Sequence, residues 1–216
     1  MILALPISAS LITIGIQRAK RVQPAFYSEA LTREPVEVDT SILLAQLDEE
    51  IESHQQWTAN LTDDQINSWL SSELEKEFPS VLPKAARSPR VKIEDGKILL
   101  ACQIVTSKTR AIFSVELHTK LTNRKNELEV EMRRPRLGVL PIPMNSYQRH
   151  LAKAAKRAKI AYRWPDDQRN SIILQLPKNR KGIKRGIIVE SLIVTTGAMQ
   201  FTGSSDQTLL SLALND

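Results

Sequence analysis

The sequence has few of the residues on which catalytic and metal-binding proteins depend. Its 216 residues include one cysteine, Cys102, and three well-separated histidines, His54, His118 and His150. A lone cysteine excludes an internal disulfide framework and a cysteine-based zinc site, and the histidines have no metal-ligand spacing. The chain also lacks a GxSxG elbow, an HExxH motif and a glycine-rich phosphate loop. We therefore expect no enzymatic activity, no metal and no cofactor, and a buried, inert thiol at Cys102.

Aromatic residues are also scarce, at 5% of the chain. Hydrophobic residues at 42% and charged residues at 25% are close to the averages of folded proteins, and the length suits one domain. The core must therefore be mostly aliphatic, which favours β-strands over a base-stacking surface. The net charge of +6 suits an anionic partner, and nucleic acid and anionic lipid meet that requirement equally well.

The first sixteen residues, MILALPISASLITIGI, carry no charged side chain, and Arg18, Lys20 and Arg21 follow them. A helix of sixteen residues spans about 24 Å. If the helix continues through Ala19, with the charged ends of Arg18 and Lys20 reaching the interface, its length approaches the ~30 Å thickness of the hydrocarbon core. We predict a single-pass membrane anchor over residues 1–21. A signal peptide, which would need a basic leading region, and a buried or interfacial helix are the alternatives. The cations that follow the apolar run favour a cytoplasmic domain.

Beyond this segment, residues 22–31 form a short amphipathic stretch with a helix start at Pro24, which either lies at the membrane interface or packs on the domain. Three longer helices are predicted after it. Residues 40–54 place apolar side chains at helical spacing, with acidic residues on the far side. A second helix begins at Thr62, which opens a capping box with Gln65, and it ends before Pro79. A third helix begins at residue 145 or 146 and runs to about Ala161. We assign residues 22–56 to a membrane-proximal helical segment and residues 57–216 to an α+β domain.

From Arg90 onward the apolar period changes from 3.6 to 2. The Asp95–Gly96 dipeptide predicts a hairpin, and two long strands follow over residues 111–121 and 128–133. Each has one apolar and one polar face, which is typical of an antiparallel sheet with one wetted face. Later strands are predicted over residues 171–176, 186–195 and 198–202.

Two candidate surfaces emerge from this pattern. The apolar face of the long strands could line a ligand site, formed by Phe113, Val115, Leu117, Val130 and Met132. Basic residues gather on one face of the third helix and in a later loop, and this patch could bind an anionic partner. It comprises Arg149, Lys153, Lys156, Arg157, Lys178, Arg180, Lys181, Lys184 and Arg185.

Two short motifs carry a resemblance to a known family. Residues 61–70, LTDDQINSWL, resemble the LT-x-x-Q-[LI]-N-x-x-L opening of the YpmS-like family of membrane-anchored bacterial proteins, and residues 136–143, RLGVLPIP, are similar to its xIGxLxLP segment. The resemblance covers residues 57–160 in outline. It implies a long curved sheet around or against a helix, similar to tubular lipid-binding domains, and an extracytoplasmic location. The family brings no established activity with it.

The sequence thus predicts an α+β protein with an N-terminal membrane-associated helix, amphipathic helices and long antiparallel strands in a curved sheet. Our leading hypothesis is a membrane-anchored envelope protein that binds a lipid or another hydrophobic ligand on its apolar sheet face, or an envelope partner protein. A scaffolding protein with a dry core is the alternative. A basic-patch nucleic-acid binder comes third, because no aromatic residue interleaves with the basic loop.

Overall fold

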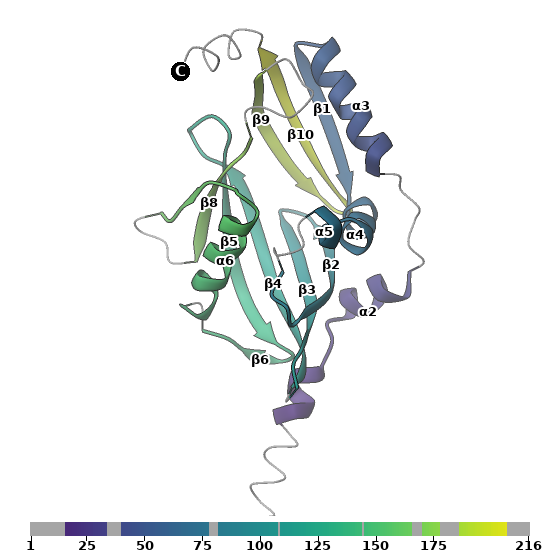
Figure 1. The fold of residues 1–216 in the computed structure, drawn as a ribbon, viewed down its shortest axis with the longest axis vertical. Helices are drawn as coiled ribbons and strands as arrows, with labels where there is room; N and C mark the ends of the chain where they lie inside the picture. The colour runs from purple at the N-terminus through teal and green to yellow at the C-terminus, as the bar shows by residue number, and fades with distance from the viewer. Residues whose placement is uncertain are drawn as a thin grey trace, which may run out of the picture.

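The computed structural model of the chain describes residues 16–33, 40–77, 82–107, 109–143, 145–165, 170–177 and 186–206. Over these ranges it is an α+β protein with antiparallel strands in two open sheets and a few helices (Figure 1). The helices are α2 (Ala25–Thr32), α3 (Thr40–Ser53), α4 (Asp63–Ser72), α5 (Leu74–Glu77) and α6 (Asn145–Arg157). The strands are β1 (Gln56–Thr62), β2 (Ala86–Glu94), β3 (Lys97–Val105), β4 (Arg110–Leu121), β5 (Glu127–Leu137), β6 (Leu140–Pro141), β7 (Tyr162–Arg163), β8 (Ser171–Gln175), β9 (Gly186–Thr195) and β10 (Ala198–Asp206).

The larger sheet has seven strands in the order β2-β3-β4-β5-β8-β7, with β6 paired to β5. The predicted Asp95–Gly96 hairpin joins β2 to β3, and Gly96 has the positive φ of 69° that such a turn needs. β4 and β5 are the long strands expected from the sequence. Their pairing shifts between Ser114 and Glu116, opposite Arg134, whose φ is 50°. An irregularity of this kind bends the strands and increases their twist.

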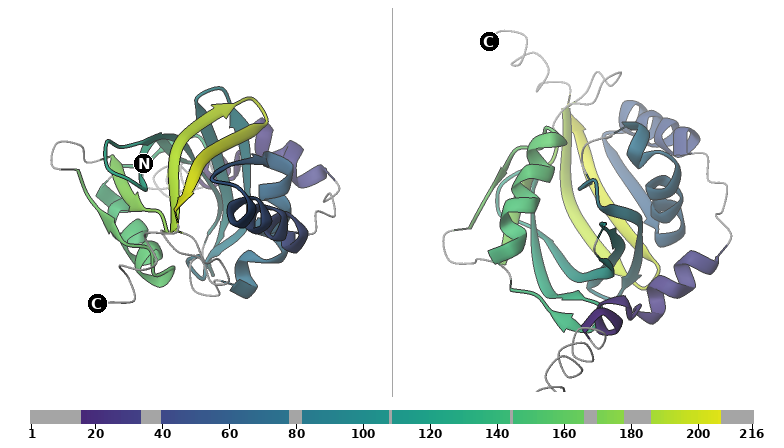
Figure 2. Two further views of the ribbon diagram at one scale, coloured as in Figure 1. Left: turned by 90° about the horizontal axis from the view of Figure 1, so that it is seen from above. Right: turned by 60° about the horizontal axis from the view of Figure 1, so that its bottom comes forward.

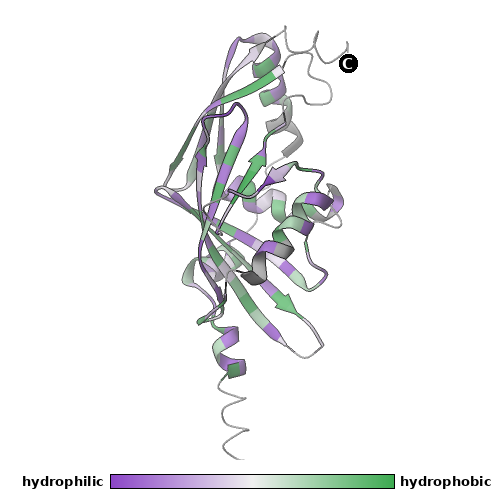
Figure 3. Ribbon diagram, turned by 90° about the vertical axis from the view of Figure 1, so that its left-hand side faces the viewer, coloured by the Kyte–Doolittle hydropathy of each residue, from purple (hydrophilic) through white to green (hydrophobic). Residues whose placement is uncertain are grey.

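One face of the larger sheet is apolar and is packed against α6. Val115, Met132 and Ile172 are buried there, and Leu151 of α6 packs on them. Figure 2 shows α6 lying alongside β5 and β8, and Figure 3 shows hydrophobic and hydrophilic residues interspersed along the strands. The period-2 pattern of the sequence therefore corresponds to a sheet with one face turned toward a core.

The smaller sheet has three strands in the order β1-β10-β9. Its β9–β10 turn contacts the β2–β3 hairpin of the larger sheet through two backbone hydrogen bonds. The Gly96 N–H donates to the Val194 carbonyl over 3.1 Å, and the Gly197 N–H donates to the Ile93 carbonyl over 3.0 Å. These bonds fix one sheet to the other at their hairpin tips.

Helix α4 begins with the predicted capping box. The Gln65 N–H donates to Thr62 Oγ1 over 3.1 Å, and the Thr62 N–H donates to Gln65 Oε1 over 2.8 Å. Asn67, inside the helix, then makes two bonds to the backbone of Val91 on the edge strand β2, as donor and as acceptor (2.8 and 2.7 Å). A short helix thereby covers polar backbone groups that an edge strand would otherwise expose.

Residues 22–56 include α2, which packs on the opposite face of the larger sheet from α6. Tyr27 is fully buried against Ala101 and Ile112, and its hydroxyl donates to the Ser88 carbonyl over 2.9 Å. This segment, predicted to be membrane-proximal, therefore contributes to the core of the domain.

The helical residues 16–21 dock on the turn between β5 and β6. The Val139 N–H donates to the Ala19 carbonyl over 3.1 Å, and a Cβ atom at Gly138 would collide with the same carbonyl oxygen. Among the described residues no helix combines the length and apolar character needed to cross a bilayer. Residues 1–15 of the predicted anchor lie outside them.

Candidate functional site

The predicted apolar ligand face comes together as the alternation indicated. Val115 and Met132 are buried in one cluster, and Phe113, Leu117 and Val130 are partly buried against it. The same cluster contains Leu151 of α6, which covers this face, together with Tyr162 of the sheet's last strand, β7, and Trp164 just after it. The two aromatic rings meet edge to face with centroids 6.0 Å apart. The chain's own side chains thus pack on this face, and its role as a ligand site stays a prediction.

The predicted basic patch is described only in part. Lys153, Lys156 and Arg157 are exposed on α6, on the side away from the buried Ala155. The side chain of Arg149 lies outside the description, as do Lys178, Arg180, Lys181, Lys184 and Arg185. The helical half of the patch therefore has the exposure that an anionic partner would require.

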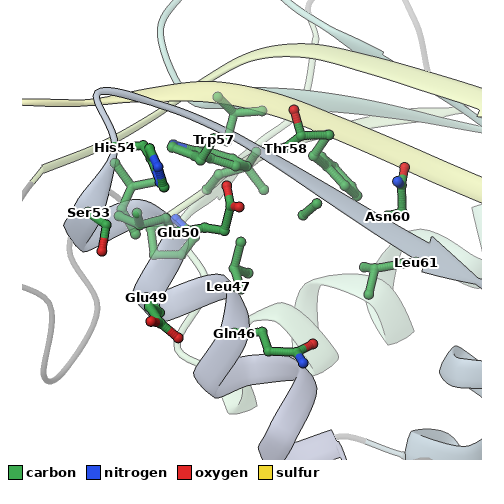
Figure 4. A pocket seen from close by; sticks show the side chains of 17 residues that line it. Gln46, Leu47, Glu49, Glu50, Ser53, His54, Trp57, Thr58, Asn60 and Leu61 are labelled. Atoms are coloured by element: carbon green, nitrogen blue, oxygen red, sulfur yellow. The ribbon is translucent and has the colours of Figure 1, made fainter.

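A groove of about 720 Å³ lies elsewhere, between α3 and the smaller sheet (Figure 4). We call it the Trp57 groove. Most of its lining residues are apolar and come from α3, β1, β9, β10 and the residues after β8. They are Gln46, Leu47, Glu49, Glu50, Ile51, Ser53, His54, Trp57, Thr58, Ala59, Asn60, Leu61, Leu176, Pro177, Ile187, Val189 and Phe201. The volume is within the range of about 300–1,000 Å³ that is usual for small-molecule sites.

Trp57 forms the floor of this groove. It is 5% exposed and clusters with Ile51 of α3 and Ile187 of β9. Its register partner on β10 is Gly203, where a Cβ atom would collide with the indole ring. Glycine at this position therefore lets the ring lie directly over the β10 backbone. Figure 4 shows Leu47 projecting from α3 toward the strand that carries Trp57.

The indole N–H of Trp57 is buried and has no hydrogen-bond acceptor among the described residues. An unpaired buried donor costs about 1–3 kcal/mol, and tryptophan in a core usually finds a partner. The nitrogen itself has almost no accessible surface, so a ligand in the groove would accept from it only after the indole ring or a neighbouring side chain moved. The unpaired indole N–H is the most specific chemical feature of the site.

The wall opposite α3 is held by one residue, Asn126, in the β4–β5 turn. Asn126 is 2% exposed, with a positive φ of 58°. Its side-chain amide donates to the Ile187 carbonyl over 2.6 Å and accepts from the Val189 N–H over 2.8 Å, and its carbonyl accepts from the Leu176 N–H over 2.7 Å. The β4–β5 turn of the larger sheet therefore positions three residues that line the Trp57 groove, namely Leu176, Ile187 and Val189.

Two titratable groups of the core, Cys102 and Tyr27, are held in their neutral forms. Cys102 is buried, as predicted, and burial raises the pKa of its thiol to about 11. Burial likewise raises the pKa of the Tyr27 hydroxyl to about 12. A protonated thiol is a poor nucleophile and a poor metal ligand. Within the described ranges no three His, Cys, Asp or Glu side chains gather closely enough to hold a metal ion.

Neither β1 nor the groove was predicted from the sequence. The signal was present, because Trp57, Ala59 and Leu61 alternate with polar residues over seven positions. The run is short and lies between two helical patterns, so its period-2 character is weak. Its partner strand, β10, is also far away in the chain.

Comparison with protein-family models, with curated proteins and with solved structures finds no match for this chain. The class of this protein is therefore defined by its structure alone. It is an α+β protein with two antiparallel sheets and an apolar groove beside the smaller sheet.

Proposed function

We propose that this protein is attached to a membrane by its N-terminal segment and binds a lipid acyl chain in the Trp57 groove. The observation that carries the proposal is the groove itself, about 720 Å³ in volume, lined mostly by apolar side chains and floored by a buried indole N–H without an acceptor. The uncharged residues 1–16 support the membrane attachment.

The chemistry of the lining narrows the ligand class. Among the described residues, the lining contains two carboxylates, Glu49 and Glu50, and neither lysine nor arginine. Within the described lining the only basic side chain is the imidazole of His54, beside two carboxylates, so this part of the groove suits a neutral ester better than a free fatty acid. Each buried methylene contributes about 0.8 kcal/mol, so eight of them give about 6 kcal/mol before the cost of ordering the chain. We therefore expect an acyl ester.

This proposal keeps the sequence-based hypothesis of a hydrophobic ligand but moves the site. The predicted face around Val115 and Met132 is packed by side chains from α6 and β7, which also supports the alternative of a scaffold with a dry core. The Trp57 groove favours ligand binding over that alternative, because a groove of about 720 Å³ with a mostly apolar lining has room for a small ligand.

Photo-crosslinking tests the site directly. The full chain in nanodiscs is incubated with a monoacylglycerol that carries a diazirine on its acyl chain, irradiated, digested and mapped by mass spectrometry. We expect labelled peptides from α3, β1 and β9. Leu47→Arg places a charge in the lining and should lower this labelling at least tenfold, which corresponds to about 1.4 kcal/mol. Ile193→Arg, at a half-exposed β9 residue outside the lining, is the matched control and should not change it.

Equal labelling of the Leu47→Arg and Ile193→Arg proteins would refute the groove as the site. Labelling confined to β4 and β5 would instead place the ligand on the face predicted from the sequence. If the protein is folded and no label is found on the domain, the alternative of a scaffolding protein with a dry core is favoured. Circular dichroism of each variant confirms that the fold is retained.

A further inference from the structure

A second cavity, of about 390 Å³, lies where the N-terminal segment joins the larger sheet. It is lined by residues just before and in α2, by β3 to β5 and by the β5–β6 turn. Its polar lining includes Arg134, Arg136, Glu116 and Ser114, and Val22 and Val139 are among its apolar lining residues. The function proposed above makes no use of this cavity.

Arg134 and Arg136 of β5 both line this cavity. Arg134 takes a φ of 50°, and the pairing with β4 shifts there, so Arg136 pairs with Ser114 two residues after Arg134. Arg134 Nη1 lies 3.3 Å from Glu116 Oε1. Arg136 makes no ion pair with any described residue. A non-glycine residue with positive φ is costly to maintain, and such strain is common at functional sites.

The cavity also lies at the end of the molecule where the uncharged segment enters. The helical residues 16–21 contact the β5–β6 turn through Ala19 and Gly138, and Figure 1 shows them together at one end of the long axis. Val22 and Val139 are 47% and 48% exposed at this end. Exposed valines beside a cationic cavity have the amphipathic character of a membrane-facing surface.

We propose that this cavity binds the phosphate head group of an anionic phospholipid in the membrane that holds the N-terminal segment. The arginine guanidinium groups match the bidentate geometry of phosphate, Glu116 orients Arg134, and the valines meet the interfacial region of the bilayer. Arg18 and Arg21, both exposed on the adjoining helical turn, strengthen the attraction to an anionic surface. This inference rests on the membrane attachment proposed above and is independent of the Trp57 groove.

The test measures how close this end of the full chain lies to the bilayer. Val139→Cys is labelled with a fluorophore, and the buried Cys102 does not compete for the reagent. The protein is placed in phosphatidylcholine nanodiscs with or without phosphatidylglycerol, and quenching by a head-group nitroxide lipid reports docking. We expect strong quenching with phosphatidylglycerol and weak quenching without it.

Neutralising both arginines, as Arg134→Gln with Arg136→Gln, should lower the docked-to-undocked ratio about thirty-fold, which corresponds to about 2 kcal/mol. The matched control is Arg124→Gln with Lys125→Gln, which removes two exposed cations at the other end of β5 and should leave the ratio unchanged. Unfolding midpoints of both double variants check the fold. Equal quenching of the two double variants would overturn the proposal.

Three further outcomes distinguish lipid phosphate from free phosphate, and the head-group site from the membrane attachment. If inorganic phosphate undocks the label in an arginine-dependent way, the cavity is a site for soluble anions and the lipid assignment is wrong. If the label is quenched equally with and without phosphatidylglycerol, the membrane attachment holds and the head-group site fails. If the protein does not co-elute with nanodiscs of either composition, the membrane attachment itself fails.

Discussion

Replacing Asn126 with alanine tests how the two sheets are held together. The change removes the side-chain hydrogen bonds to the Ile187 carbonyl and the Val189 N–H, and it leaves alanine at a φ of 58°. Each buried backbone group that loses its partner costs about 1–3 kcal/mol, and the left-handed conformation costs a non-glycine residue about 1–2 kcal/mol. We expect the free energy of unfolding to fall by about 3–8 kcal/mol, a large share of the usual 5–15 kcal/mol.

Urea unfolding of the full chain in nanodiscs, followed by tryptophan fluorescence, measures this loss. Asn123→Ala is the matched control, since Asn123 is exposed in the same turn, and it should lie within about 0.5 kcal/mol of the parent. Asn126→Gly separates the two causes, because glycine adopts positive φ readily but makes no side-chain bonds. Compared with Asn126→Ala, the glycine variant should recover at most the part of the lost unfolding free energy that comes from the left-handed backbone conformation. An Asn126→Ala protein within about 1 kcal/mol of the parent would refute the reasoning.

Two further predictions concern ionisable groups. The hydrogen bond from Arg163 to Glu127 holds the pKa of that carboxyl below its usual range, and their ion pair is 2.8 Å long. A lowered pKa stabilises the fold above the unfolded-state value of about 4.3, and this contribution is lost as pH falls through the folded-state pKa. Glu127→Gln should therefore be less stable at pH 7 and show a flatter decline in acid, and parallel pH–stability curves would contradict this. Cys102, buried with its pKa raised to about 11, should react with maleimide at pH 7 only after urea is added, and rapid labelling of the native protein would disprove its burial.

Elements that depend on local chemistry were predictable from the sequence. The capping box at Thr62, the Asp95–Gly96 hairpin and the alternation along β4 and β5 each arise from residues close together in the chain, and each is confirmed. Boundaries were less accurate. β2 begins at Ala86, four residues before its predicted start, and contains Pro89, which an edge strand tolerates because one of its backbone edges has no partner strand.

The Trp57 groove was not predictable, because its parts come from distant segments. Its floor is on β1, whose partner is β10, and the Ser205 hydroxyl donates to the His54 carbonyl across 151 positions. Its wall depends on Asn126, which looks like an ordinary turn residue in the sequence. Local periodicity does not show which strand a short strand pairs with, nor which backbone groups the side-chain amide of a turn residue bonds to. Arg134 and Arg136 of the second cavity lie close together in the sequence, but the shift in strand pairing beside Arg134 has no local signal.

The two proposed sites lie at opposite ends of the long strand β5, and this arrangement limits how a lipid could reach the groove. Asn126 precedes β5 and holds the groove wall, whereas Gly138 follows β5 at the proposed membrane contact. Eleven residues at about 3.3 Å each separate these ends by roughly 36 Å. An acyl chain in the Trp57 groove would therefore have left the bilayer completely. Since each methylene exposed to water costs about 0.8 kcal/mol, such a transfer would need an apolar path along the protein or a partner that meets the groove at its distal end.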